Sequence, residues 1–289
     1  MGDFTVLQQV GEGSFGLVWK AIDNRSKEIV AMKQMKESCS LLDECLELTE
    51  VKALIKLRDD TTIVRLRDVV LVNQVLYLVF DYVESTLQRL MDDRISLCKD
   101  ELLRITESEI RGWSRQIFLS LAQMHRPGGY IHRDLKPANL LVTKGEKLIK
   151  ISDFGQAREV GCQAPCSDYV TTRWYRAPEV LLKSASYNSA VDMWAMGAIM
   201  AELYSFSVLF PGENREDQLD KICKGIHLAN SCIYKFPQIL PCGLSAMLPS
   251  AGLEARDLIK SNKRPTAMEA LQHPYFVDTK NGTHRVALF

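Results

Sequence analysis

The sequence predicts an α+β fold of two lobes, in which a small five-stranded antiparallel sheet lobe with one main helix precedes a larger, mainly helical lobe. The chain of 289 residues is longer than one ordinary compact core requires, and its 46% hydrophobic residues are enough to fill two. Five short β-rich runs occupy residues 4–82, and the hydrophobic period becomes helical after residue 84. We therefore expect a sheet lobe at 1–83, a helical lobe at 84–276 and a C-terminal extension at 277–289.

The elements of the sheet lobe follow from the spacing of its apolar residues. Runs rich in β-branched and aromatic residues predict strands at 4–10, 16–22, 28–35, 64–72 and 75–82. Between the third and fourth strands, apolar residues from 41 to 57 recur at largely helical spacing, which predicts a single helix. The linker between the lobes is expected near residues 81–84, where the period changes.

The second part of the chain is predicted to be mainly helical. The spacing predicts helices at 85–93 and 107–125, short strands at 139–142 and 148–152, and a helix at 191–203 that begins a second helical series. The longest apolar stretch, 190–204, contains Asp192 and Glu202 and is too short to span a bilayer. We interpret it as a buried helix and expect no membrane partner.

Charge and cysteine content exclude some classes of function. The 36 basic residues balance the 36 acidic ones, whereas a nucleic-acid-binding protein normally shows a basic excess, so we expect no nucleic-acid partner. The eight cysteines show no CxxC spacing, and no hydrophobic leader precedes the first strand. A reduced, intracellular chain is the simplest interpretation.

A glycine-rich string lies between the first two predicted strands. It consists of Gly11, Glu12, Gly13, Ser14, Phe15 and Gly16, followed by Leu17 and Val18. Glycines let the backbone approach a phosphate closely enough for its N–H groups to donate hydrogen bonds to the oxygens. A dinucleotide-binding turn shares this spacing but requires a helix after it, and residues 17–21 are typical of a strand. The string therefore favours a loop over nucleotide phosphates.

Three further strings occur in the order that phosphoryl transfer requires: His132-Arg133-Asp134 with Asn139, Asp153-Phe154-Gly155, and Ala177-Pro178-Glu179. Asp134 would orient the attacking hydroxyl, and Lys136 would offset charge on the transferring phosphoryl group. Asn139 and Asp153 offer the oxygen ligands that Mg²⁺ prefers.

A lysine and a glutamate complete the predicted catalytic set. Lys33, on the third strand, would reach the α- and β-phosphates of a nucleotide, and it needs an anionic partner to hold it there. Glu50, on the helix that follows, is the candidate for this partner, although Glu47 lies one turn earlier.

Together these residues resemble the eukaryotic protein kinase family from residue 10 to residue 276. The resemblance implies the bilobal protein kinase fold over 1–289, with ATP and Mg²⁺ as cofactors and protein substrates. Transfer to Ser or Thr is implied because Lys136 lies in the string Asp134-Leu135-Lys136-Pro137-Ala138-Asn139. The resemblance also implies an adenine pocket, in which Val10, Val18, Ala31 and Leu141 sandwich the ring, Phe80 stands behind it, and Asp81 and Val83 present backbone groups.

A finer resemblance concerns the activation segment. Residues 167–169 (Ser-Asp-Tyr) and 172–179 resemble the group of cyclin-dependent, MAP and glycogen synthase kinases, and within it the male germ cell-associated and intestinal cell kinases. This implies activation by phosphorylation at Tyr169 or Ser167, by an upstream kinase or by autophosphorylation, with the phosphate paired to Arg133, Arg173 or Arg176. Arg176 is implied to favour proline after the acceptor residue. The branch also implies a cytoplasmic or nuclear location and a role in cilia or flagella.

Some features depart from the family pattern. The helix around Glu50 lacks a PSTAIRE-like string, so no cyclin partner is expected, and we expect a monomer. The stretches after Cys223 and after Ile259 are short, either because of real deletions or because residues are absent from the sequence as given. Gln156 stands where Leu is usual. A catalytically weak, pseudokinase-like scaffold is the alternative function, and an ion pair between Glu179 and Arg264 is expected to hold the large lobe together.

Overall fold

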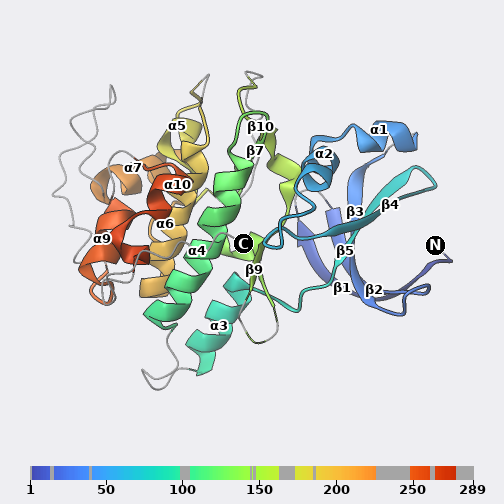
Figure 1. The fold of residues 1–289 in the computed structure, drawn as a ribbon, viewed down its shortest axis with the longest axis horizontal. Helices are drawn as coiled ribbons and strands as arrows, with labels where there is room; N and C mark the ends of the chain where they lie inside the picture. The colour runs from blue at the N-terminus through green and yellow to red at the C-terminus, as the bar shows by residue number, and fades with distance from the viewer. Residues whose placement is uncertain are drawn as a thin grey trace.

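The computed structural model of the chain describes residues 2–13, 16–38, 41–97, 105–143, 145, 148–162, 173–184, 187–225, 248–260 and 264–277. Figure 1 shows the sheet at one end of the molecule and most of the helices at the other, with α2 at the boundary between them. The predicted two-lobe α+β fold is therefore confirmed.

The sheet lobe is built on five antiparallel strands in the order β1-β2-β3-β5-β4. They are β1 (Phe4–Gly13), β2 (Gly16–Asp23), β3 (Ile29–Ser38), β4 (Leu66–Val72) and β5 (Val75–Asp81), so all five predicted strands are confirmed. Val18 lies opposite Lys33, and Ala31 lies opposite Phe80. Because directly paired residues share one face of a sheet and alternate residues return to it, these four side chains belong to the same face.

The prediction of one helix between β3 and β4 is wrong. Two helices occupy this region, α1 (Leu42–Leu46) and α2 (Thr49–Lys56), and Leu48 between them has an extended ψ of 135°. In one continuous helix, Cys45 and Glu50 would point about 140° apart, because each residue turns the helix by about 100°. The break allows both side chains to be buried.

The helical lobe follows the predicted order. Its elements are β6 (Ser85–Thr86), α3 (Leu87–Leu97), α4 (Glu107–Met124), β7 (Tyr130–Ile131), β8 (Leu140–Val142), β9 (Ile149–Ile151), β10 (Arg158–Glu159), α5 (Pro178–Leu181), α6 (Ala190–Ser205), α7 (Arg215–Gly225), α9 (Leu253–Lys260) and α10 (Ala267–Leu271). The helix predicted at 85–93 instead begins with β6, which pairs with β8. Asp192 and Glu202 of α6 are both buried, which confirms that this apolar segment is a buried helix.

One hydrophobic cluster extends from the sheet lobe into the helical lobe. It contains Leu54 of α2 and Leu78 of β5 together with Phe118 of α4 and Phe154, which follows β9. The site between the lobes therefore rests on a continuous core. In the residues that the structure describes, no helix has the length and apolar character needed to cross a membrane.

Among the cysteines that the structure describes, Cys45 differs from the expectation of a reduced chain. Cys45 is disulfide-bonded, whereas Cys162 and Cys223 keep their thiols. The expectation of fully reduced cysteines is therefore wrong at Cys45.

Candidate active site

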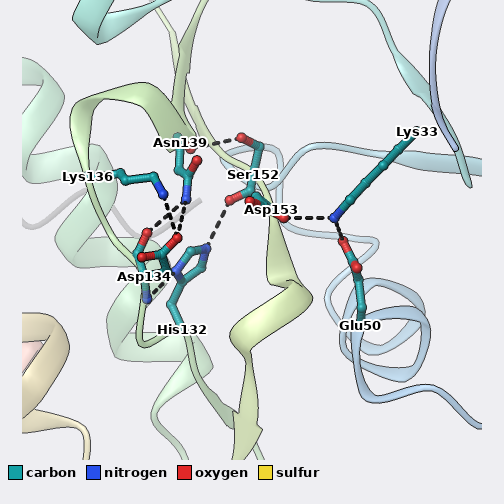
Figure 2. Close-up of polar contacts among 8 residues, drawn as sticks. All are labelled: Lys33, Glu50, His132, Asp134, Lys136, Asn139, Ser152 and Asp153. Atoms are coloured by element: carbon teal, nitrogen blue, oxygen red, sulfur yellow. Dashed lines mark hydrogen bonds and ion pairs between the residues drawn. The ribbon is translucent and has the colours of Figure 1, made fainter. Parts of the chain in front are cut away.

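Lys33 joins three separate segments at the boundary between the lobes (Figure 2). Its Nζ lies 2.7 Å from Oε1 of Glu50 on α2 and 2.7 Å from Oδ1 of Asp153, which follows β9. Lys33 is 8% exposed and Glu50 is 6% exposed. The structure therefore selects Glu50, and not Glu47, as the partner of Lys33; Glu47 instead pairs with Lys52.

The electrostatics of this cluster keep Lys33 and Asp153 charged. Burial acts to lower the pKa of Lys33, but the Glu50 and Asp153 carboxylates outweigh it and raise the pKa above its usual value. Burial likewise acts to raise the pKa of Asp153, but the Lys33 ammonium outweighs it and holds the pKa below its usual range. Asp153 is thus ready to bind a cation near neutral pH.

The segment after β7 brings the predicted catalytic side chains together. The Nζ of Lys136 donates a hydrogen bond to Oδ2 of Asp134 at 2.7 Å. The Nδ2 of Asn139 donates to the carbonyl oxygen of Asp134 at 2.8 Å and to its Oδ2 at 3.2 Å. These contacts fix one carboxylate oxygen of Asp134, which leaves its other oxygen, Oδ1, as the candidate acceptor for a substrate hydroxyl.

Hydrogen bonds tie this catalytic segment to the segment that carries Asp153. The Nε2 of His132 lies 2.9 Å from the carbonyl oxygen of Ser152, and the N–H and hydroxyl of Ser152 each donate to the carbonyl of Asn139 at 2.9 Å (Figure 2). Asp153 adopts a left-handed φ of 63°, and Arg133 one of 71°. Such conformations are strained for residues with side chains, and they persist where surrounding contacts determine them, as at functional sites.

The donor atoms of Asn139 and Asp153 fit a magnesium ion. Because Nδ2 of Asn139 donates to Asp134, Oδ1 is the atom of this amide that could bind a cation. The set is then oxygen only, as Mg²⁺ prefers. No group of three or more His, Cys, Asp or Glu side chains within the described part of the chain could hold a metal ion, so phosphate oxygens and waters would have to complete the shell.

The β1–β2 hairpin leaves space where a nucleotide phosphate is expected. A Cβ at Gly11 would lie 3.7 Å from Val18, and one at Gly13 would lie 4.0 Å from the carbonyl of Gly16, so neither glycine is required by packing within the protein. Gly16 differs, since a Cβ there would lie 1.8 Å from the carbonyl oxygen of Gln34. Glu12 is exposed, while Ser14 and Phe15 lie outside the described residues.

The residues predicted for the adenine pocket lie on both sides of the boundary between the lobes. Ala31, Phe80 and Leu141 belong to one hydrophobic cluster, with Ala31 and Leu141 only partly buried. Val18 and Val83 are also partly buried, and Val10 is 42% exposed. The N–H of Asp81 donates to the carbonyl of Arg65 at 3.2 Å, so Asp81 would offer its carbonyl oxygen rather than its N–H to a ligand.

The sequence motifs did not reveal the role of a buried carboxylate on α6. Asp192 of α6, which is 1% exposed, accepts hydrogen bonds at 2.8 Å from the backbone N–H groups of His132 and Arg133 and at 2.9 Å from Nε2 of His125. Burial acts to raise the pKa of Asp192, but these donors outweigh it and hold the pKa low. Asp192 thereby holds the start of the catalytic segment, and the only sequence signal for it was a charge inside an apolar helix.

The activation segment is described only in part, and Ser167 and Tyr169 lie outside the described residues. The guanidinium of Arg133 lies 5.4 Å from the ring centre of Tyr187. Arg158, which sequence reasoning missed, also interacts with the side chains of Cys162 and Tyr187. The N–H of Arg176 donates to the carbonyl of Arg173 at 3.0 Å.

The expected Glu179–Arg264 pair and the unusual Gln156 differ in how far the structure accounts for them. Arg264 forms a two-pronged ion pair with Glu179, one arm of which is 3.0 Å long, and it lies 4.9 Å from the ring centre of Trp194. The expected pair is therefore present, although Arg264 has a left-handed φ of 41°. Gln156 is 8% exposed, and its carbonyl accepts from Arg133 at 3.4 Å. No contact among the described residues explains why a glutamine side chain stands at this position.

Comparisons with known proteins agree with this geometry. A family profile described as "Protein kinase domain" matches residues 4–276. "Serine/threonine-protein kinase MAK" of Mus musculus is 42% identical over 315 residues, which cover 99% of this chain and 49% of that protein. "Cyclin-dependent kinase F-4" of Oryza sativa subsp. japonica is 45% identical over 294 residues, which cover 96% of this chain and 62% of that protein. For "Serine/threonine-protein kinase ICK" of Mus musculus the identity is 42%, over 96% of this chain and 45% of that protein. The chain thus spans about half the length of these relatives.

Proposed function

The chain belongs to the protein kinase family, and on this premise we propose that it transfers the γ-phosphoryl group of ATP to Ser or Thr hydroxyls of protein substrates. The main observation in support of this proposal is that Lys33 lies between Glu50 and Asp153 and donates hydrogen bonds to both. A pseudokinase-like scaffold would not need this buried ion cluster beside an intact Asp134, Lys136 and Asn139. We therefore favour the enzyme over the scaffold.

Each residue of the site has a role that follows from its contacts. Asp134 orients the substrate hydroxyl and accepts its proton, and Asn139 fixes the carboxylate that does so. Lys136, which pairs with Asp134, is close enough to offset negative charge on the transferring group. Lys33, held by Glu50, orients the α- and β-phosphates.

ATP supplies the phosphoryl group, and Mg²⁺ neutralises charge on its phosphates when both are bound. Asp153 and Oδ1 of Asn139 would hold the metal ion. The backbone of the glycine-rich string would cover the phosphates. This string consists of Gly11, Glu12, Gly13, Ser14, Phe15 and Gly16. The adenine would be held between apolar side chains and the backbone of the linker. The apolar residues are Val10, Val18, Ala31, Phe80 and Leu141, and the linker residues are Asp81 and Val83.

Regulation and specificity are proposed from the resemblance to the male germ cell-associated and intestinal cell kinases. Phosphorylation of Tyr169, or of Ser167, would add nearly two negative charges that Arg133, Arg173 or Arg176, together with Arg158, could pair, and thereby order the activation segment. Arg133 and Arg158 both lie beside Tyr187, which supports a shared anion site. Arg176 would favour proline after the acceptor residue.

The cellular role is proposed in the same way. The partners are protein substrates and, unless the chain phosphorylates itself, an upstream kinase. We propose an intracellular enzyme of the cytoplasm or nucleus with a role in cilia or flagella. One relative is named a cyclin-dependent kinase, but α2 of this chain lacks a PSTAIRE-like string, and we propose neither a cyclin partner nor a stable oligomer.

The function is tested by measuring phosphate transfer from Mg-ATP to two peptides that differ only in having proline or alanine after the acceptor Ser. We expect transfer to both, with a kcat/KM at least about tenfold higher for the proline peptide, since that ratio corresponds to a preference of about 1.4 kcal/mol in the transition state. Equal rates would contradict the proposed role of Arg176. A complete lack of transfer to these peptides and to a generic basic protein would favour the scaffold.

A further inference from the structure

The last residue of α2 reaches across to the helical lobe. The Nζ of Lys56 donates a hydrogen bond to the carbonyl oxygen of Gly128 and lies 5.9 Å from the ring centre of Tyr130. Gly128 lies in the connection between α4 and β7, and Tyr130 is the first residue of β7, whereas α2 belongs to the sheet lobe. The helix that carries Glu50 is therefore tied at its C-terminal end to the other lobe, at the boundary visible in Figure 1.

The loop that receives Lys56 is built to hold this carbonyl in place. Gly128 has a left-handed φ of 71°, which favours glycine. A Cβ at Gly129 would lie 2.0 Å from the carbonyl oxygen of Met124, so this residue must also be glycine. The N–H of Gly129 donates to the carbonyl of Arg126 at 2.8 Å, which closes the turn.

The same loop is connected to the catalytic and activation segments. The carbonyl of Gly129 accepts a hydrogen bond of 2.8 Å from the N–H of Val160. Tyr130 begins β7, which pairs with β10 and leads directly into His132 and the catalytic segment. A bond from Lys56 to this loop therefore connects the position of α2 to both segments.

We propose that Lys56 is a positioning residue for phosphoryl transfer, which holds α2 against the helical lobe and so keeps Glu50 in place to bind Lys33. The break at Leu48 separates α2 from α1, so an eight-residue helix must be oriented largely by its own contacts. Glu50 lies six residues before Lys56, about 9 Å along the helix axis. A hydrogen bond at one end of so short a helix limits how far the other end can tilt. This inference rests on the proposed kinase function.

The chain offers a matched control in Lys52. Lys52 lies one helical turn before Lys56 on α2, and its Nζ is 2.5 Å from Oε2 of Glu47, within the sheet lobe. Replacing Lys52 removes a lysine from the same helix, and with it a charge that acts on Tyr130 and Glu159, but it removes no hydrogen bond between the lobes among the described residues. Lys56→Arg serves as the conservative variant, because a guanidinium can also donate to the Gly128 carbonyl.

The test compares Lys56→Met, Lys56→Arg and Lys52→Met with the unmodified chain in kcat, KM for Mg-ATP and backbone hydrogen exchange over residues 51–56. Since Lys56 is exposed, we expect a fall in kcat of about two- to fivefold for Lys56→Met, with little change in KM. Exchange over 51–56 should be faster in Lys56→Met, while Lys56→Arg and Lys52→Met should match the unmodified chain. Thermal unfolding of all four proteins checks that a global loss of stability is not the cause.

Three results would overturn the inference: equal effects of Lys56→Met and Lys52→Met, unchanged exchange in Lys56→Met, or faster exchange with an unchanged kcat. A failure of the proposed function can be distinguished from a failure of this inference. If the unmodified chain transfers no phosphate, the kinase proposal fails, whereas hydrogen exchange still reports whether Lys56 holds α2.

Discussion

At the scale of single residues, Lys33 determines how the site is charged. Its ammonium is buried between two carboxylates, and each partner comes from a different segment of the fold. The ion cluster is therefore both a structural link and the means of keeping Asp153 ionised for a cation. Removing one member of such a buried group leaves the others without compensation.

We predict that Lys33→Met lowers turnover by roughly 10²- to 10³-fold, the usual effect of removing a preorganised electrostatic contact to the reacting group. Its effect on nucleotide affinity should be smaller, because the adenine contacts remain. Steady-state kinetics with a separate measurement of nucleotide Kd distinguishes the two effects. Lys36→Met is the control, since Lys36 lies on the same strand and is exposed. A larger loss of affinity than of turnover would argue against the proposed role of Lys33.

The prediction about regulation concerns Tyr169. We expect Tyr169→Phe to fold normally but to lose at least about fivefold in activity. This factor is the lower end of the energetic coupling that is typical between a regulatory site and an active site. The physical reason is that the activation segment would lack the charge that pairs with its arginines. Mass spectrometry of active protein should find phosphate on Tyr169. Full activity of the variant, or active protein without phosphate there, would rule the switch out.

At the scale of elements, Glu109 holds the ends of two helices together. It closes a capping box with Thr106 at the start of α4, and it pairs with Arg94 of α3 at 2.8 Å. Burial acts to raise the pKa of Glu109, but Arg94 and the Thr106 donors outweigh it and lower the pKa to about 2. A carboxyl whose pKa is lowered by folding stabilises the folded state above its unfolded pKa, and this contribution is lost as the pH falls through the folded pKa.

We therefore predict that Glu109→Gln lowers the free energy of unfolding at pH 7 by about 1–2 kcal/mol, a value discounted for the partial exposure of the side chain. The difference from the unmodified chain should shrink as the pH falls from 4.5 towards 2. Urea unfolding at several pH values measures this. Glu107→Gln is the control, because Glu107 lies in the same turn but, among the described residues, its salt bridge is to the partly exposed Arg111. A difference that does not depend on pH would contradict this account.

The sequence was most informative about long, regular elements. Five strands, α4 and α6 could be located because their apolar residues recur over several turns or alternations. The strands β6, β7 and β10 contain two residues each, too few to show any period. The break at Leu48 could not be predicted either, because the apolar spacing continues across it and only tertiary packing separates the burial of Cys45 from that of Glu50.

At the scale of the whole molecule, the site exists because the two lobes meet. Lys33 and Glu50 come from the sheet lobe, whereas Asp134, Asn139 and Asp153 come from the helical lobe. Motifs in the sequence identified these residues individually, since each lies in a short string with a known chemical use. Asp192, Arg158 and Lys56 could not be found in this way, because their roles depend on partners that are distant in sequence.

The residues around Lys33 and Asp134 are proposed to form the active site of a protein kinase, and phosphate transfer by Asp134→Asn tests this assignment most directly. We expect at least about a 100-fold loss of kcat, the usual lower contribution of a positioned acid or base, with the affinity for Mg-ATP close to that of the unmodified chain. The reason is that the Asp134 carboxylate is proposed to act on the substrate hydroxyl, whereas the proposed metal ligands Asn139 and Asp153 remain. Turnover by Asp134→Asn at the rate of the unmodified chain would contradict the account.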